Sequence, residues 1–367
     1  MHITDLANEI LLHILQSCPT ISSLLAVAST CKHLHSILAH HKLPLLYQSF
    51  EAQYGPSQDA IRLVTYNSSQ LAHIPRPAPP QSMALLQRLV EAGQVAEKWA
   101  TVYPSQKWTA EESANRRLLS TAESYKLRRA CYRVWLYNMA FHTPQHTRMG
   151  RLQPQVVRTR AQVLRPWPAE QLAEMLDLHA IFRAVLHSHI CPSNGTVLRR
   201  HKQRFPDDPF PLVSATKVAR LINDPLADFH QAFFHSTPHV SKLSMANSYS
   251  QYGATVEGWG DEITQYYVVE DMLKFDPGQL MHLYRSLTGQ AGSDAELTAF
   301  NSFGSRKATV EHFVAGQGDW FENNGETLVE TICFVVGERG GDGRELGELV
   351  EGGLEGICRR DLVDDVE

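Results

Sequence analysis

The sequence lacks the features that would place the protein in a membrane or outside the cell. It has no run of 18 consecutive apolar residues, about the length that a membrane-spanning helix requires. Its first residues contain no basic segment and no small-residue cleavage site of the kind that marks a secretory signal. Its 6 cysteines include no C-x-x-C pair, the spacing typical of zinc and redox sites. We therefore expect a cytoplasmic or nuclear protein that keeps its cysteines as reduced thiols and has no membrane partner.

Signatures of catalysis are also missing. The sequence contains neither the G-x-S-x-G turn of serine hydrolases, nor a glycine-rich phosphate loop, nor the H-E-x-x-H pair of zinc proteases. Among the histidines, Pro144 separates His142 from His146, so this pair does not share a helix face. His187 and His189 are two residues apart and point to different faces. We expect no catalytic site, no metal site and no cofactor, and we interpret the protein as a non-enzyme.

Alternation of apolar and polar residues, the mark of a β-strand, is almost absent. Apolar residues instead recur at helical spacing, which predicts helices over 83–99, 109–141 and 172–189. Thr109 and Glu112 form the Thr-x-x-Glu pattern of a capping box, and we expect this pattern to open the helix over 109–141. The predicted fold class is mainly α. Shorter helices are predicted at 214–223, 226–234, 261–275, 278–287 and 326–336.

A proline-rich stretch suggests a boundary between domains. Four of the six residues at 75–80 are prolines, which neither a helix interior nor a central strand accommodates. We interpret residues 47–82 as a proline-rich linker or loop, and a ligand for a proline-recognition domain is the alternative. The segment would separate residues 1–46 from an irregular α-helical body, 83–336. The body has no leucine-rich repeat and no repeated Trp-Asp signature, so we expect neither a horseshoe nor a propeller.

The end of the chain is acidic and rich in glycine. Residues 337–367 hold ten Asp or Glu against four Arg, a net charge of −6, whereas the whole chain carries −5. Glycine combined with like charges disfavours packing, so we expect a poorly ordered acidic tail. An arm that covers a basic face or attracts a basic partner is the alternative.

The first 46 residues predict three short helices that carry much apolar surface. Apolar residues recur at helical spacing over 10–18, 24–31 and 34–38. Pro19 ends the first of these helices, and Thr20 is the predicted N-cap of the second. A unit of about 45 residues buries too little surface to be stable by its own core alone. We expect its apolar faces to be covered by the rest of the chain, as in an ordinary helical hairpin, or by a partner.

The same residues resemble the F-box, a short helical module. The string LANEIL at 6–11 stands where F-box sequences usually have Leu-Pro-x-Glu-Ile-Leu. The string LLAVASTCK at 24–32 stands where they have a leucine, a valine-serine pair and a basic residue. Ala7 replaces the usual proline, which loosens the start of the first helix but removes no apolar residue. The body is similar to the helical, repeat-free bodies of many fungal-style F-box proteins.

The resemblance implies a function in ubiquitin transfer. The N-terminal helices would bind the Skp adaptor of a Skp–cullin–F-box ubiquitin ligase, and through it cullin, while the body recruits a protein substrate. A Skp complex outside any ligase, in which the protein is a structural or regulatory partner, is the alternative. Apolar residues at helical spacing suit a helix-in-groove contact. The residues predicted to form the Skp contact and the small shared core are Leu6, Ile10, Leu11, Ile14, Leu15, Leu24, Leu25, Val27, Ala28 and Leu34.

A long basic stretch contains no carboxylates. No Asp or Glu occurs at 124–169, and a further basic cluster lies at 199–204. Arginine binds carboxylate and phosphate with two parallel hydrogen bonds, so these stretches predict contacts with an acidic or phosphorylated substrate. A solvated surface, partly paired with the acidic tail, is the alternative. Nucleic acid is disfavoured because the pI is about 6.4 and no known binding motif accompanies the charge. The predicted contacts are Arg128, Arg129, Arg158, Arg160, Arg199 and Arg200.

Overall fold

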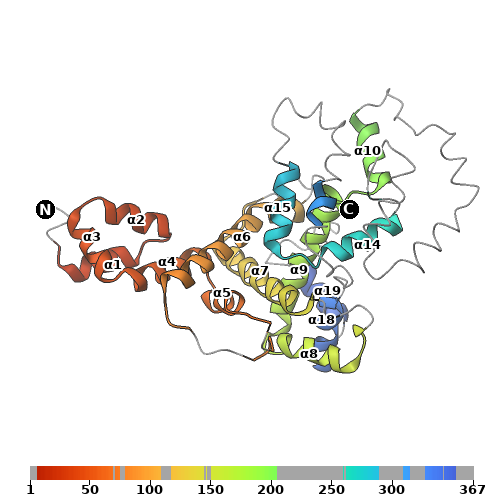
Figure 1. Ribbon diagram of the computed structural model, residues 1–367, viewed down its shortest axis with the longest axis horizontal. Helices are drawn as coiled ribbons and strands as arrows, with labels where there is room; N and C mark the ends of the chain where they lie inside the picture. Colours follow the sequence, from red (N-terminus) through yellow and green to blue (C-terminus); the bar gives the residue numbers. More distant parts are fainter. Residues whose placement is uncertain are drawn as a thin grey trace, which may run out of the picture. The chain divides into compact units, whose positions relative to one another are not determined.

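The fold is mainly α, as the sequence predicts. All regular structure in the described ranges is helical, and these ranges contain no strand (Figure 1). None of the helices in this part of the chain is long and apolar enough to cross a membrane. The computed structural model describes residues 6–68, 71–74, 79–108, 117–143, 146, 150–204, 259, 262–288, 309–314, 327–341 and 343–352.

The chain divides into two compact units. The first comprises Met1–Leu136, Glu170–Leu178 and Gly347–Glu367, and the second comprises Tyr137–Ala169 and His179–Leu346. Two long helices, α7 (Thr121–Phe141) and α9 (Ala169–Val185), each contribute residues to both units. The predicted boundaries at residues 46, 82 and 336 are not tested by this division and stay predictions.

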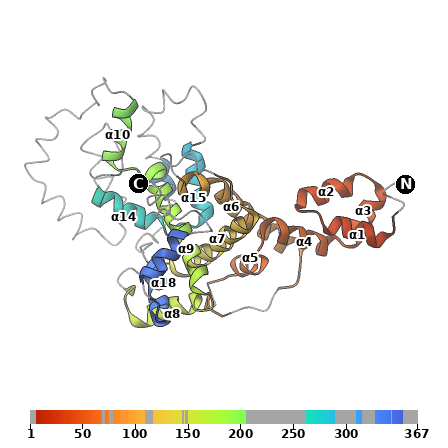
Figure 2. The same ribbon diagram turned by 180° about the vertical axis from the view of Figure 1, so that it is seen from behind.

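The first unit begins with three short helices that share one small core (Figures 1 and 2). They are α1 (Asn8–Gln16), α2 (Ile21–Ser29) and α3 (Lys32–His40), and each packs against the other two. The predicted N-cap of α2 is confirmed, because the Thr20 side chain accepts a hydrogen bond from the backbone N–H of Ser23 at 3.0 Å. The Ser23 hydroxyl in turn accepts from the backbone N–H of Thr20, which completes a reciprocal cap.

Helix α4 (Lys42–Tyr54) packs against all three of these helices and also against α6 (Met83–Lys107). It is followed by α5 (Ser57–Val64), which packs on α4 and α6. The expectation of a linker or loop over 47–82 is therefore wrong for 47–54 and 57–64. Pro44 does not prevent α4 because it lies in the first turn, where no helical hydrogen bond needs its missing N–H. Residues 75–78, which include two of the four prolines at 75–80, lie outside the described residues.

Gly93 allows α6 to approach α4. A methyl group added at Gly93 would lie 2.6 Å from Cγ of the buried Tyr54 ring. We expect Gly93→Ala to lower the free energy of unfolding by about 1–3 kcal/mol through this clash, measured by urea unfolding. The control is Gly347→Ala in α19 (Gly343–Gly352), where nothing lies within 4 Å of the added methyl. This second change should stabilise by up to about 1 kcal/mol, the usual gain in a helix, and equal effects would contradict the prediction.

Helix α7 starts later than the sequence predicts. Residues 117–120 are not helical, so the Thr109–Glu112 pattern does not open this helix, and residues 109–116 lie outside the described residues. The capping contacts are instead made by Ser120 and Glu123, each accepting from the other's backbone N–H, at 3.2 and 2.7 Å. Arg117 also donates to the Glu123 carboxylate, which lowers the pKa of Glu123 to about 2.

The second unit is held together by buried polar contacts as well as apolar packing. Helix α8 (Pro154–Leu164) packs against α18 (Thr327–Glu338), and α14 (Glu262–Met272) and α15 (Pro277–Thr288) pack against the π-helix η4 (Leu186–Ile190), which continues α9. The buried Tyr137 hydroxyl donates to the Thr327 carbonyl at 2.8 Å. The Asn138 amide donates to the carbonyls of Leu273 and Phe275. The predicted helices at 261–275, 278–287 and 326–336 are confirmed, and those at 214–223 and 226–234 lie outside the described residues.

The acidic tail expected from Gly337 begins with helical structure. Helix α18 extends to Glu338, and α19 follows at Gly343–Gly352. Leu346 on α19 is buried, which gives this helix an apolar contact despite its charge. The remainder of the tail, 353–367, lies outside the described residues.

Two buried histidines make the second unit sensitive to acid. Burial, together with the nearby Lys274, lowers the pKa of His142 to about 3. Burial and Arg183 do the same for His179, whose pKa also falls to about 3. The unfolded chain therefore takes up protons first as the pH falls below about 6.5. The contribution of each histidine to the free energy of unfolding is fully present above that pH. It falls by about 1.4 kcal/mol per pH unit between that pH and about pH 3.

Urea unfolding at a series of pH values measures this loss. We expect His179→Gln to flatten the acid limb of the stability curve relative to the unchanged chain. An equally steep limb in the variant would contradict the role of His179.

Candidate functional site

The ten residues predicted for the N-terminal site fall into three groups. Five are buried within the first unit and build its small core: Leu11, Leu15, Leu24, Ala28 and Leu34. Three are partly exposed: Leu6, Ile14 and Val27. Ile10 and Leu25 are exposed, at 48% and 47% of their full surface. Half of the predicted set therefore forms a core, and the other half remains available to a partner.

Helical geometry explains this division on α1. Leu11 and Leu15 are four residues apart and both are buried, whereas Ile10 and Ile14 occupy the neighbouring row. The core is filled by the first row, so Ile10 stays in solvent. Ala7 is the N-cap residue of α1, and it makes no side-chain cap hydrogen bond.

Helix α2 is divided in the same way. Leu24 and Ala28 are buried four residues apart, and Leu25 is turned by about 100° from Leu24 around the helix axis. Single exposed apolar residues are common on any protein. Here they lie on two neighbouring helices of one small domain, together with the partly exposed Ile14 and Val27. Ile10 and Leu25 are thus the exposed apolar anchors that the helices α1 and α2 offer.

The comparison with protein families identifies this segment. Residues 3–46 match the F-box domain, so the chain carries an F-box domain formed by α1, α2, α3 and the start of α4. No curated protein and no solved structure matched the chain. An F-box domain implies binding to Skp and is typical of substrate adaptors of Skp–cullin–F-box ligases. F-box adaptors are generally non-catalytic, and no catalytic domain was identified in the chain.

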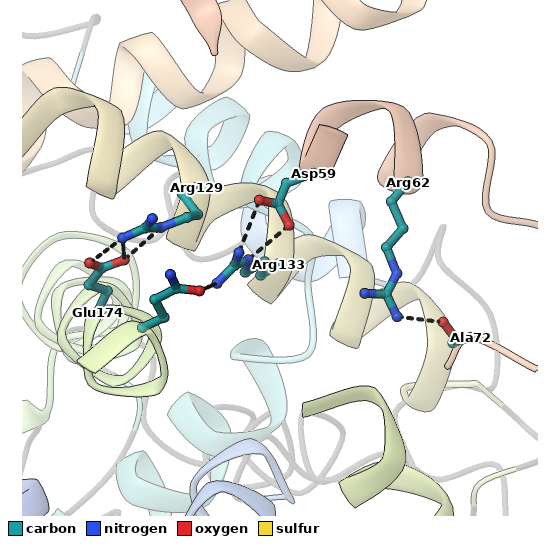
Figure 3. Close-up of polar contacts among 7 residues, drawn as sticks. Asp59, Arg62, Ala72, Arg129, Arg133 and Glu174 are labelled. Carbon is teal, nitrogen blue, oxygen red and sulfur yellow. Dashed lines mark hydrogen bonds and ion pairs between the residues drawn. The ribbon is translucent and has the colours of Figure 1, made fainter. Parts of the chain in front are cut away.

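Arg128 and Arg129 of α7 do not form the exposed basic surface that the sequence predicts. Arg128 is buried, and it donates to the Gly55 carbonyl and to Glu97. Arg129 forms a two-pronged ion pair with Glu174 on α9, with distances of 2.6 to 3.0 Å (Figure 3). These contacts lie inside the first unit, so Arg128 and Arg129 do not present an open site to a substrate.

Arg133 completes an arginine clamp, which we define as Arg129 and Arg133 with their partners on α5 and α9. Arg133 donates to both carboxylate oxygens of Asp59 at 2.8 and 3.1 Å, and to the Gln171 side chain at 2.6 Å (Figure 3). The partners lie 38 to 74 residues away in the sequence, which is why the sequence did not reveal them. The clamp is structural and fixes α5, α7 and the start of α9 within the first unit.

Asp177 extends the polar row on α9. Gln171, Glu174 and Asp177 are spaced by three residues, so they share one side of the helix. Asp177 accepts from the Tyr103 hydroxyl and from Lys107, at 2.5 Å for the second contact. Burial and Asp177 raise the pKa of Tyr103, which keeps the hydroxyl as a donor. The whole row on α9 is therefore bonded to α6 and α7.

The remaining predicted arginines lie in the second unit. Arg160 is buried and donates to the Arg151 carbonyl, so it too serves the fold. Arg158, Arg199 and Arg200 are exposed. Among the described residues of 124–169, Arg128, Arg133 and Arg160 are buried, so the basic stretch does not form one exposed face there. Of the three exposed predicted arginines, Arg199 and Arg200 lie together on α10 (Asn194–Arg204).

Proposed function

We propose that the protein is a substrate-recognition adaptor of a Skp–cullin–F-box ubiquitin ligase that acts in the cytoplasm or nucleus. The F-box domain at 3–46 supports this proposal most directly. Ile10 and Leu25 supply apolar surface for Skp, at 48% and 47% exposure, and Leu6, Ile14 and Val27 add to it at the edges. The helical remainder of the chain recruits the protein to be modified.

The contribution of such an adaptor is proximity. Holding a target beside the ubiquitin-transfer machinery turns an encounter in solution into a reaction within one assembly, which raises the effective concentration of the target. No side chain of the adaptor needs to take part in bond making. This agrees with a chain in which the polar groups of the first unit are used to fix helices to one another.

Reconstitution with purified Skp and cullin tests the proposal. The full chain, mixed with both proteins, should elute with them as one complex in size-exclusion chromatography. A complex with Skp that excludes cullin would overturn the ligase role and favour a Skp complex of another kind. Absence of Skp from the complex would overturn the proposal altogether.

A further inference from the structure

Helix α10 carries a concentrated positive charge. Its eleven residues include Arg199, Arg200, Lys202 and Arg204 and no carboxylate, and no Asp or Glu occurs anywhere over 178–204. The side chains of Arg199 and Arg200 are exposed. Arg199 makes a contact only three residues back on its own helix, with Thr196 at 3.2 Å among the described residues. The helix thus offers cationic side chains to solvent.

The helix is anchored to an unusual turn. Arg200 donates to the carbonyl of Ser188 at 2.7 Å, and Ser188 lies in the π-helix η4. Gln265 on α14 donates to the carbonyl of Cys191, at 2.7 Å, just beyond the same turn. A π-helix has a less favourable backbone geometry than an α-helix and is found often at functional sites. Here side chains from two other helices contact the turn and its end, and Arg200 links α10 to it.

Further side chains lie on η4 and on the two helices that pack against it, α14 and α15. The His189 ring of η4 lies edge-on to the Tyr284 ring of α15, with centroids 5.3 Å apart. The buried carboxylate of Glu270 on α14 is paired with Arg183. Asp271, also buried, is paired with Lys274 at 3.0 Å. Both carboxylates thus have cationic partners within the second unit.

We propose that η4 and α10 form a docking surface for a segment rich in Asp and Glu in the protein that the adaptor recruits. This inference rests on the proposed function, because it names the substrate chemistry of the same adaptor. Arg199 and Arg200 bind the carboxylates through their planar guanidinium groups, each with several N–H donors. An acidic protein is favoured over nucleic acid because the sequence pI is about 6.4 and no known nucleic-acid-binding motif accompanies the charge.

Fluorescence anisotropy with the full chain tests the surface. The probe is a labelled short peptide that alternates Glu and Ser, compared with one that alternates Gln and Ser. We expect only the Glu peptide to bind, and the binding should weaken as salt is added. Replacing Arg199 and Arg200 by Gln should weaken it about tenfold, since two charged contacts are lost. Arg199→Gln alone leaves the contact between Arg200 and Ser188 in place. It should still weaken binding of the Glu peptide, by less than the double change.

The control removes two exposed arginines elsewhere, Arg88 and Arg339, by the same change to Gln. It should leave binding of the Glu peptide unchanged. Equal losses in the two double variants, or equal binding of the Glu and Gln peptides, would overturn the docking surface. Tighter binding of duplex DNA that depends on Arg199 and Arg200 would overturn the choice of an acidic protein. Skp binding of the unchanged chain is measured in parallel. If that chain does not bind Skp, the result contradicts the adaptor role and not the peptide surface.

Discussion

Replacing Ile10 and Leu25 together by Asp is expected to weaken Skp binding by about a hundredfold or more. Each side chain is already about half exposed, so the free protein loses little stability. In the complex, an apolar anchor commonly contributes at least about 2 kcal/mol, and a carboxylate buried without a partner adds a further cost. Isothermal titration calorimetry of the full chain against purified Skp measures the change.

The matched control for this experiment is Leu71→Asp. Leu71 is 56% exposed, belongs to the same unit, and lies outside the F-box domain. It should bind Skp as the unchanged chain does. Leu11→Asp provides the opposite contrast, because Leu11 is fully buried and its replacement should unfold the F-box helices, seen as a loss of helical circular dichroism. Unaltered Skp affinity in the Ile10/Leu25 variant would refute the assigned contact.

The second large effect concerns the arginine clamp. Glu174→Gln is expected to lower the free energy of unfolding by about 3 kcal/mol, because it leaves the Arg129 guanidinium charged and poorly compensated. Only 17% of the Arg129 side chain and 8% of the Glu174 side chain are exposed, so water replaces little of the lost contact. Urea unfolding followed by circular dichroism gives the value.

A second ion pair of the same geometry provides the comparison. Glu338 accepts two-pronged hydrogen bonds from Arg165, but these side chains are 37% and 43% exposed. Glu338→Gln should therefore cost less than about 1 kcal/mol. Replacing both Arg129 and Glu174 by Met removes the buried charges together and should recover much of the stability lost by Glu174→Gln. A single-site loss no larger than that at Glu338 would show that the clamp is not a major contribution to the fold.

The helices that could be predicted from the sequence are those whose signals are local. The faces of α1, α2 and α3, and the Thr20 cap, depend on residues within one or two turns. The start of α7 was misplaced because two capping patterns compete, and the one at Ser120 and Glu123 is used. Helices α4 and α5 were missed because the proline-rich character of residues 75–80 was extended to the whole segment 47–82.

The candidate site was predictable only in part for a different reason. Helical spacing identifies rows of apolar residues, but it does not say which row is buried in the protein's own core. Leu11 and Ile10 were therefore treated alike. The absence of Asp and Glu at 124–169 in the sequence was misleading, because it suggested that the arginines of α7 are unpaired. The carboxylates that neutralise Arg128, Arg129 and Arg133 come from Glu97, Glu174 and Asp59, 31 to 74 residues away, and only tertiary structure brings them together.

The shared helix α4 limits how this F-box could be grafted onto another protein. A cut at residue 46, where the family match ends, falls in the second turn of α4 and removes Phe50 and Tyr54. A chimaera would retain the complete helix only if the junction were moved to Gly55. Even then the transplanted ring of Tyr54 would need a host helix with a glycine facing it, as Gly93 does here.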